Sequence, residues 1–311
     1  GQVLPWRVLI TGKKGDDWSL GGQALHLQPL TDLLRQFPLP PKLDTLLTEL
    51  KPVGYLPAFS LRWRQAPDQP WILQLLKADI RQLSWQATRD IPGAQGLNGW
   101  VSWRDGVGNA ALNMSGGVLD LKPVFREPTP VTALSARFSF RRLADAWLIR
   151  SNRIQVQNGD ATGEALLSLW IPREAPGRAR MQLLAGLHDG RVDSVWRYVP
   201  WPSAGDDTLA WLKSALREGR LAQGNFLYEG PLVDRPDDIP SRMQMRFDLE
   251  DATLAYAPGW PELRKLQATV TLDNRHLQVR ARQGQLYESI ARNIVADIPE
   301  LNKPVLNVTA D

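Results

Sequence analysis

Two short stretches near the C-terminal end of the chain decide its fold: residues 243–249 read MQMRFDL, and residues 266–272 read LQATVTL. In both stretches apolar and polar residues alternate, so an extended backbone carries its apolar side chains on one face and its polar side chains on the other. Turn-forming residues follow the second stretch at 273–275. This pattern predicts antiparallel strands that bury only one face.

The same alternation recurs at intervals of about ten residues through most of the chain. It is present at 97–103, 110–114, 134–140, 165–169 and 277–281. Turn signals separate these segments, among them the triplet Asn158-Gly159-Asp160, and no long helical pattern alternates with them. The predicted fold class is therefore mainly β, an extended and twisted antiparallel sheet that forms an elongated groove, with two short helical insertions.

Two regions break the alternation and predict the helical insertions. Residues 29–50 carry leucines at helical spacing on both sides of a proline-rich run, which predicts two short amphipathic helices joined by a proline elbow. Residues 207–218 predict another helix, ended by Gly219. We expect this helix to act as a lid or plug at the apolar face through Leu209, Trp211, Leu212 and Leu216. The sequence leaves open whether the helix lines, narrows or covers the groove.

A faint internal repeat relates residues 72–125 to residues 243–298. In each copy a strand leads to a Pro-Gly corner, at Pro92 and at Pro258, and further strands follow. Units that cannot close a core of their own stack along one axis. We therefore expect residues 1–311 to form a single elongated segment, and the start without an initiator Met predicts that it belongs to a longer protein.

Composition narrows the function further. The chain has 311 residues, no Cys and 3 His, so thiol chemistry and most metal sites are excluded, and we expect no cofactor and no metal. The 37 basic and 33 acidic residues are interleaved, so the net charge of +4 does not indicate nucleic-acid binding. No apolar run approaches the roughly 20 residues of a membrane-spanning helix, so we expect this segment to be soluble.

No motif indicates catalysis. Adjacent acidic pairs such as those at 16–17, 206–207 and 237–238 occur in contexts typical of turns and helix caps rather than of glycosidase carboxylates. No nucleophile elbow is present, and the three histidines are far apart in the sequence. We therefore expect the protein not to be an enzyme.

The apolar face of the predicted strands has two interpretations. It is either an open trough that binds the acyl chains of phospholipids, with about 0.8 kcal/mol gained per buried methylene, or the interior of a closed β-sandwich. The residues that would line the trough are those facing inward on the clearest strands, namely Leu112, Met114, Leu134, Phe138, Phe140, Leu167, Leu169, Met243, Met245, Phe247, Leu249, Leu266, Val270, Leu272, Leu277 and Val279.

Several segments together resemble a known family. They are IPGAQGLNG at 91–99, YVP at 198–200, LAWLKSALREG at 209–219, GNFLYEG at 224–230 and APGWP at 257–261. The chain is similar, over most of its length, to the YhdP branch of the AsmA-like proteins of Gram-negative bacteria, bridge-like lipid transport proteins related to TamB.

The resemblance implies a central fragment of a periplasmic protein anchored in the inner membrane. Such a protein conducts phospholipids between the inner and outer membranes along a hydrophobic β-groove of the chorein-like type. Phospholipid acyl chains and envelope proteins are the partners implied, and nucleic acid is not. The alternative left open is a non-enzymatic periplasmic β-sandwich, a structural or interaction module that supports outer-membrane integrity.

Overall fold

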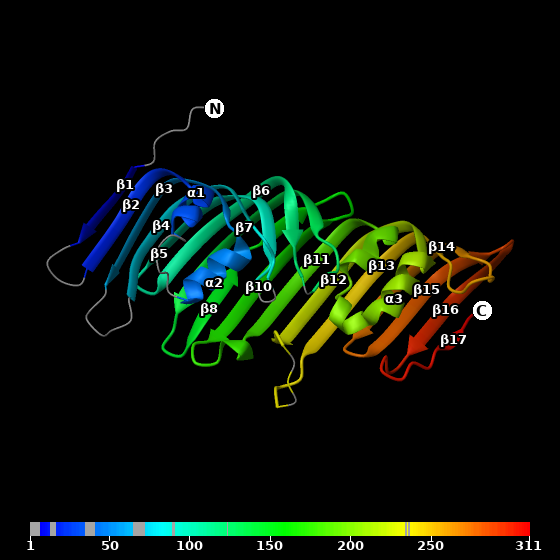
Figure 1. The fold of residues 1–311 in the computed structure, drawn as a ribbon. Coiled ribbons are helices and arrows are strands. Elements are labelled where there is room, and N and C mark those ends of the chain that lie inside the picture. The colour runs from blue at the N-terminus through cyan, green and yellow to red at the C-terminus, as the bar shows by residue number, and fades with distance from the viewer. Residues whose placement is uncertain are drawn as a thin grey trace. The chain divides into compact units, whose positions relative to one another are not determined.

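The structure, a computed structural model, describes residues 7–12, 17–34, 41–64, 72–88, 91–122, 124–233, 235 and 237–311. Antiparallel strands dominate it and the helices are few and short, which confirms the predicted fold class (Figure 1). The chain divides into two compact units. Unit 1 comprises residues 1–122 and 127–154, and unit 2 comprises residues 123–126 and 155–311.

Unit 1 is a meander in which each described strand pairs antiparallel with the next strand along the chain. Its elements are β1 (Arg7–Gly12), β2 (Asp17–His26), α1 (Leu27–Leu34), α2 (Pro41–Leu50), β3 (Val53–Arg64), β4 (Ile72–Trp85), β5 (Gly93–Arg104), β6 (Val107–Asp120), β7 (Thr129–Arg142) and β8 (Ala146–Ser151). The predicted helix pair at 29–50 corresponds to α1 and α2, and the proline elbow between them lies outside the described residues.

Unit 2 is a second meander of the same kind, and the short strand β9 (Ile154–Gln157) spans the point in the chain where the units divide. Its elements are β10 (Thr162–Pro172), η1 (Pro176–Arg178), β11 (Arg180–Arg191), η2 (Val192–Tyr198), α3 (Trp201–Ala215), β12 (Leu216–Pro231), β13 (Arg242–Leu254), β14 (Leu263–Asp273), β15 (His276–Leu286), β16 (Ser289–Ile298) and β17 (Asn307–Thr309). Here η1 and η2 are 3₁₀ helices.

Bulges interrupt the strand pairing at similar places in the two units. In β4 the register shifts between Ile80 and Leu83, where Gln82 has a φ of 51°. In β13 it shifts between Leu249 and Ala252, where Asp251 has a φ of 49°. Bulges bend a strand and increase its twist, so both meanders curve at these positions. The internal repeat and the single-segment organisation themselves stay predictions.

The helix α3 differs from the predicted helix at 207–218. It begins at Trp201 because Pro200 and Pro202 suit its first turn, and it kinks at Gly205, where φ is 74°. It ends at Ala215 because Leu216 is extended and pairs with Leu254 as the first residue of β12. The predicted helix end at Glu218 is therefore wrong.

Gly219 lies inside β12 rather than at the end of the helix. Its φ is 128°, and a Cβ atom at this position would lie 2.6 Å from the Cα atom of Ala252 on the neighbouring strand β13. The glycine is thus required by a close approach of two strands and not by helix termination.

Candidate functional site

The register of unit 2 gathers apolar side chains on one face of β10–β16. Directly paired residues of antiparallel strands point to the same side of a sheet. One row of paired residues runs Leu167, Leu183, Tyr228 and Met243, and the next runs Ala185, Phe226, Met245, Leu272, Leu277 and Ile298. A third row contains Leu187, Gly224, Phe247, Val270, Val279 and Ala296. We call this surface the apolar face of unit 2.

Unit 1 has a corresponding apolar face. Across β2–β8 one row of paired residues connects Leu20, Leu61, Leu76, Trp103, Gly108, Phe140 and Ile149. The adjacent row contains Phe59, Ala78, Val101, Ala110 and Phe138. Charged and amide side chains such as Lys77, Asn109 and Arg137 occupy the opposite face.

The structure brings the predicted lining residues together within each unit. Leu112, Met114, Leu134, Phe138 and Phe140 lie on the apolar face of unit 1. The other predicted residues lie on the apolar face of unit 2, namely Leu167, Leu169, Met243, Met245, Phe247, Leu249, Leu266, Val270, Leu272, Leu277 and Val279. Most of them are half-buried, but Met114 and Leu266 are only 2% and 5% exposed.

Sequence reasoning missed several residues of both faces. In unit 2 these include Met181, Leu183, Phe226 and Tyr228 on β11 and β12. Their alternation is obscured because Leu184 and Leu227 face the opposite, polar side, where Leu184 is 50% exposed. In unit 1 the missed residues include Leu61, Leu76 and Trp103.

One end of the apolar face of unit 2 is closed. Here Val192, the first residue of η2, packs against Ala252, Leu266, Ala268 and Ala281 of β13–β15, and Val192 is completely buried. Leu216, Leu249 and Leu263 surround this cluster. The 3₁₀ helix therefore supplies the second layer that a sheet needs for a dry core.

The rest of that face is open. Met243, Met245, Val270, Leu272 and Leu277 are half-buried although each has a paired strand on both sides. The neighbouring strands cover the flanks of these side chains, so their remaining exposure points away from the sheet. The result is an apolar surface available to a ligand.

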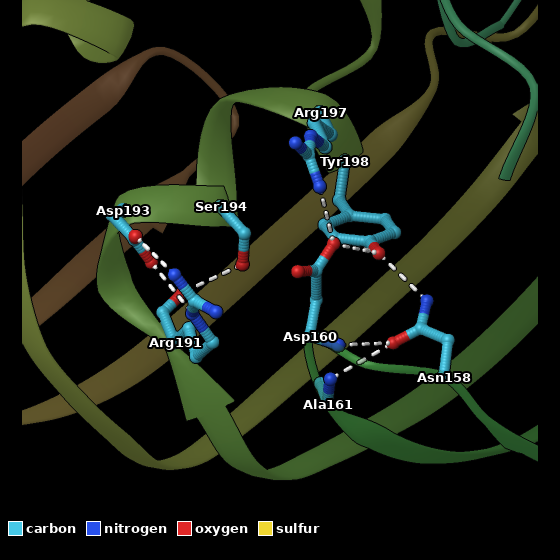
Figure 2. Close-up of polar contacts among 8 residues, drawn as sticks. All are labelled: Asn158, Asp160, Ala161, Arg191, Asp193, Ser194, Arg197 and Tyr198. Atoms are coloured by element: carbon cyan, nitrogen blue, oxygen red, sulfur yellow. Dashed lines mark hydrogen bonds and ion pairs between the residues drawn. The ribbon is translucent and has the colours of Figure 1, made fainter. Parts of the chain in front are cut away.

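A polar network fixes η2 to the turn between β9 and β10 (Figure 2). The Tyr198 hydroxyl donates a hydrogen bond of 2.9 Å to Asp160 Oδ2 and accepts one of 2.7 Å from Asn158 Nδ2. Arg197 donates to the same carboxylate at 3.0 Å. Asn158 Oδ1 in turn accepts the backbone N–H groups of Asp160 and Ala161, each at 2.9 Å. We call Asn158, Asp160, Arg197 and Tyr198 the latch.

The latch is shielded enough to change the acidity of its tyrosine. Burial, and after it the hydrogen bond to the charged Asp160, together raise the pKa of Tyr198 from 10.0 to about 12. At the start of η2, the hydrogen bond from Arg191 lowers the pKa of Asp193. Ser194 donates to the carbonyl oxygen of Arg191 at 2.9 Å, within the first turn of η2.

The helix α3 continues the cover beyond η2, with which it is in contact. Leu209 is 5% exposed and Ala215 is fully buried, whereas Trp211 is 45% exposed. The Trp211 indole donates to the carbonyl oxygen of Tyr256 at 3.2 Å and so attaches α3 to the segment that follows β13. Of the residues predicted to form the lid or plug, Leu216 lies in β12 and Leu212 is half-buried.

The acidic pairs make structural contacts. Asp17 pairs with Arg64, Asp206 with Arg126, and Asp237 with Arg178; Asp16 lies outside the described residues. Among the residues that the structure describes, no three His, Asp or Glu side chains gather as metal ligands. No helix in the described ranges is both long and apolar enough to cross a bilayer.

These features define a class: a β-meander protein that presents a partly covered apolar surface. The model of the YhdP protein family matches residues 6–311, so the chain belongs to the YhdP family, and the resemblance found in the sequence is confirmed. Over 309 residues the chain is 24% identical to the intermembrane phospholipid transporter YhdP of Escherichia coli strain K12. The match covers 96% of this chain and 23% of that relative. No solved structure matches.

Proposed function

We propose that this chain is a periplasmic segment of an intermembrane phospholipid transporter anchored in the inner membrane. Its apolar faces hold the acyl chains of phospholipids in passage, while the headgroups remain in water at the strand ends. The protein works without catalysis and without a cofactor. Family membership and the name of the E. coli relative support this proposal.

The observation that carries the proposal is the open apolar face of unit 2. Its rows of half-buried Leu, Met, Phe and Val continue from strand to strand without a charged residue among them. Each methylene that enters such a surface gains about 0.8 kcal/mol, and no single side chain dominates. Binding that is weak and evenly distributed lets a lipid slide, whereas a deep pocket would hold it.

The closed end gives the covering helices a role in this transport. Because η2 covers the face around Leu266 and leaves Val270 and Leu272 uncovered, it acts, together with the adjoining α3, as a lid that limits where acyl chains lie. Met and Phe side chains on the open part adapt their shape to a moving chain.

The competing function is that of a structural or interaction module of the envelope, built as a closed β-sandwich. It would need a second sheet facing the first, and within each unit the described strands pair in a single layer. The single layer favours the transporter.

Site-specific photo-crosslinking tests the proposal with neighbouring residues as matched controls. Benzoylphenylalanine is placed at Val270, on the apolar face, and separately at Thr271, on the opposite face of the same strand, in the full-length protein in intact cells. We expect phospholipid adducts at Val270 and none at Thr271. A second pair, Met245 and Arg246, repeats the test on β13.

Adducts of equal yield on both faces, or adducts only with protein, would contradict lipid passage along the apolar face. Lipid species are identified by mass spectrometry of the crosslinked product. Comparable protein levels for all variants serve as the folding control.

A further inference from the structure

The polar face of unit 1 carries an ordered row of arginines that the transport proposal does not use. The strand register connects Arg62, Leu75, Arg104, Val107, Arg141 and Leu148 as directly paired residues on β3–β8. All of them point away from the apolar face of the unit. We call Arg62, Arg104 and Arg141 the arginine row.

Basic and apolar residues alternate strictly along this row. The three arginines are exposed, Val107 is 52% exposed, and Leu75 and Leu148 are half-buried. The neighbouring row contains Ser60, Lys77, Ser102, Asn109, Ser139 and Arg150, which adds two positive charges. A hollow of about 550 Å³ lies at the two rows, and its lining residues are Leu75, Lys77, Ser102, Trp103, Arg104, Asp105, Val107 and Asn109.

The arginine row is not neutralised by carboxylates of the described residues. No carboxylate among them lies within ion-pair distance of Arg62, Arg104 or Arg141. Asp17 is hydrogen-bonded to Arg64 and attracts Arg62 only through longer-range charge interaction. Unit 2 differs, because Arg220 there pairs with both Asp189 and Glu250. Unpaired exposed arginines at regular spacing offer a complementary surface for an acidic partner.

The spacing indicates the form of that partner. Strands lie about 4.8 Å apart, so arginines on every second strand are spaced by about 10 Å. Seven residues of an α-helix advance about 10.5 Å along its axis. A helix that crosses the strands therefore meets an arginine with every seventh residue and an apolar side chain halfway between.

We propose that the arginine row is a docking surface for an acidic amphipathic helix with a seven-residue repeat. In each repeat a carboxylate pairs with one arginine, and an apolar residue three or four positions later contacts Leu75, Val107 or Leu148. An anionic membrane surface is the weaker alternative, since it needs positive charge but no alternation with apolar residues.

Fluorescence anisotropy with two labelled peptides tests this docking surface on the whole chain. The first peptide has three repeats with Glu at the first position and Leu at the fourth and fifth positions. The second has the same composition with the order of residues scrambled. We expect the first peptide to bind at least about tenfold more tightly than the second, since three aligned ion pairs and the apolar contacts act together.

Variants separate the row from general charge attraction. The triple variant Arg62→Gln, Arg104→Gln, Arg141→Gln should weaken binding of the first peptide about tenfold. The control Arg217→Gln, Arg280→Gln, Arg282→Gln removes the same charge from exposed arginines of unit 2 and should change binding less than about threefold. Val107→Ser should weaken binding without any change in charge.

Three results would overturn the proposal. The first is equal binding of both peptides, and the second is equal loss in both triple variants. The third is binding of phosphatidylglycerol vesicles through the arginine row with no binding of either peptide. Circular dichroism of each variant confirms that folding is unchanged.

Discussion

The closed and the open parts of the apolar face in unit 2 are built from the same strands. On β14, Leu266 and Leu272 point to the same side of the sheet, yet Leu266 is 5% exposed and Leu272 is half-buried. The strand pattern does not distinguish them, because both continue one alternation. The difference comes from η2, whose Val192 covers Leu266 and its neighbours. A covering segment thus decides whether an apolar residue is core or binding surface.

We expect the greatest loss of stability from a substitution at one of these two leucines, Leu266, and a much smaller loss at the other, Leu272. Leu266→Asp places a carboxylate in the closed cluster and should cost about 4 to 5 kcal/mol of unfolding free energy, because the charge is buried without a partner. Leu272→Asp should cost about 1 kcal/mol, since its carboxylate reaches water, while lipid binding is lost. Urea denaturation measures both, and equal costs would show that the face is closed throughout.

Loss of the latch should have a smaller effect that is confined to the cover. Tyr198→Phe removes the hydrogen bonds to Asp160 and Asn158 and should cost about 1 to 2 kcal/mol. Hydrogen exchange should accelerate in η2 and remain unchanged at the open end of β14. Tyr287→Phe, at a tyrosine that is 78% exposed, is the control and should alter neither. Uniform acceleration across unit 2 would argue against a separate cover.

Alkaline pH should destabilise the closed end of the face through ionisation of Tyr198. Its pKa is raised from 10.0 to about 12, so the folded state favours the protonated phenol. The stability that this group contributes is therefore complete below pH 10 and is lost as the pH rises from about 10 to about 12. Ultraviolet titration should show a tyrosine ionisation near pH 12 that Tyr198→Phe abolishes. A titration curve near pH 12 that is the same with and without Tyr198→Phe would contradict the shielded latch.

The smallest effect is expected at the attachment of α3. Trp211→Phe removes the hydrogen bond to the carbonyl of Tyr256, and since Trp211 is 45% exposed the cost should stay below about 1 kcal/mol. Thermal unfolding measures it. Trp100→Phe is the control, at 43% exposure on the polar face of unit 1, and should have no effect. A larger loss of stability for Trp211→Phe than for Tyr198→Phe would show that the cover is held mainly through α3 and not through η2.

Sequence reasoning predicted the apolar face and a lid or plug helix at 207–218, but not the cover that η2 provides. Period-two alternation placed Met243, Phe247 and Val270 on one side because side-chain direction in a strand is fixed by local geometry. The same reasoning failed for β11 and β12, where Leu184 and Leu227 face the polar side and interrupt the period. An exposed apolar side chain costs a folded protein little free energy, so the alternation of residues alone does not show which side of the sheet such a residue faces.

The closed end was not predictable from the sequence, because it depends on contacts between residues that are distant in the chain. Asn158, Gly159 and Asp160 were identifiable as a turn, but Tyr198, which the turn binds, follows forty residues after Asn158. No local pattern connects two such segments. The end of α3 was misjudged for a similar reason, since Leu216 and Gly219 are held by β13 and not by the helix.

Native mass spectrometry of the chain purified without detergent shows whether the open apolar face holds phospholipid acyl chains. Three proteins are compared: the unaltered chain, Leu272→Asp on the apolar face and Thr271→Asp on the opposite face of the same strand. We predict bound phospholipid in the unaltered chain and in Thr271→Asp, and its loss from a folded Leu272→Asp variant. Equal lipid occupancy in all three proteins, or a lipid-free mass for each after incubation with phospholipid, would contradict the binding of acyl chains at this face.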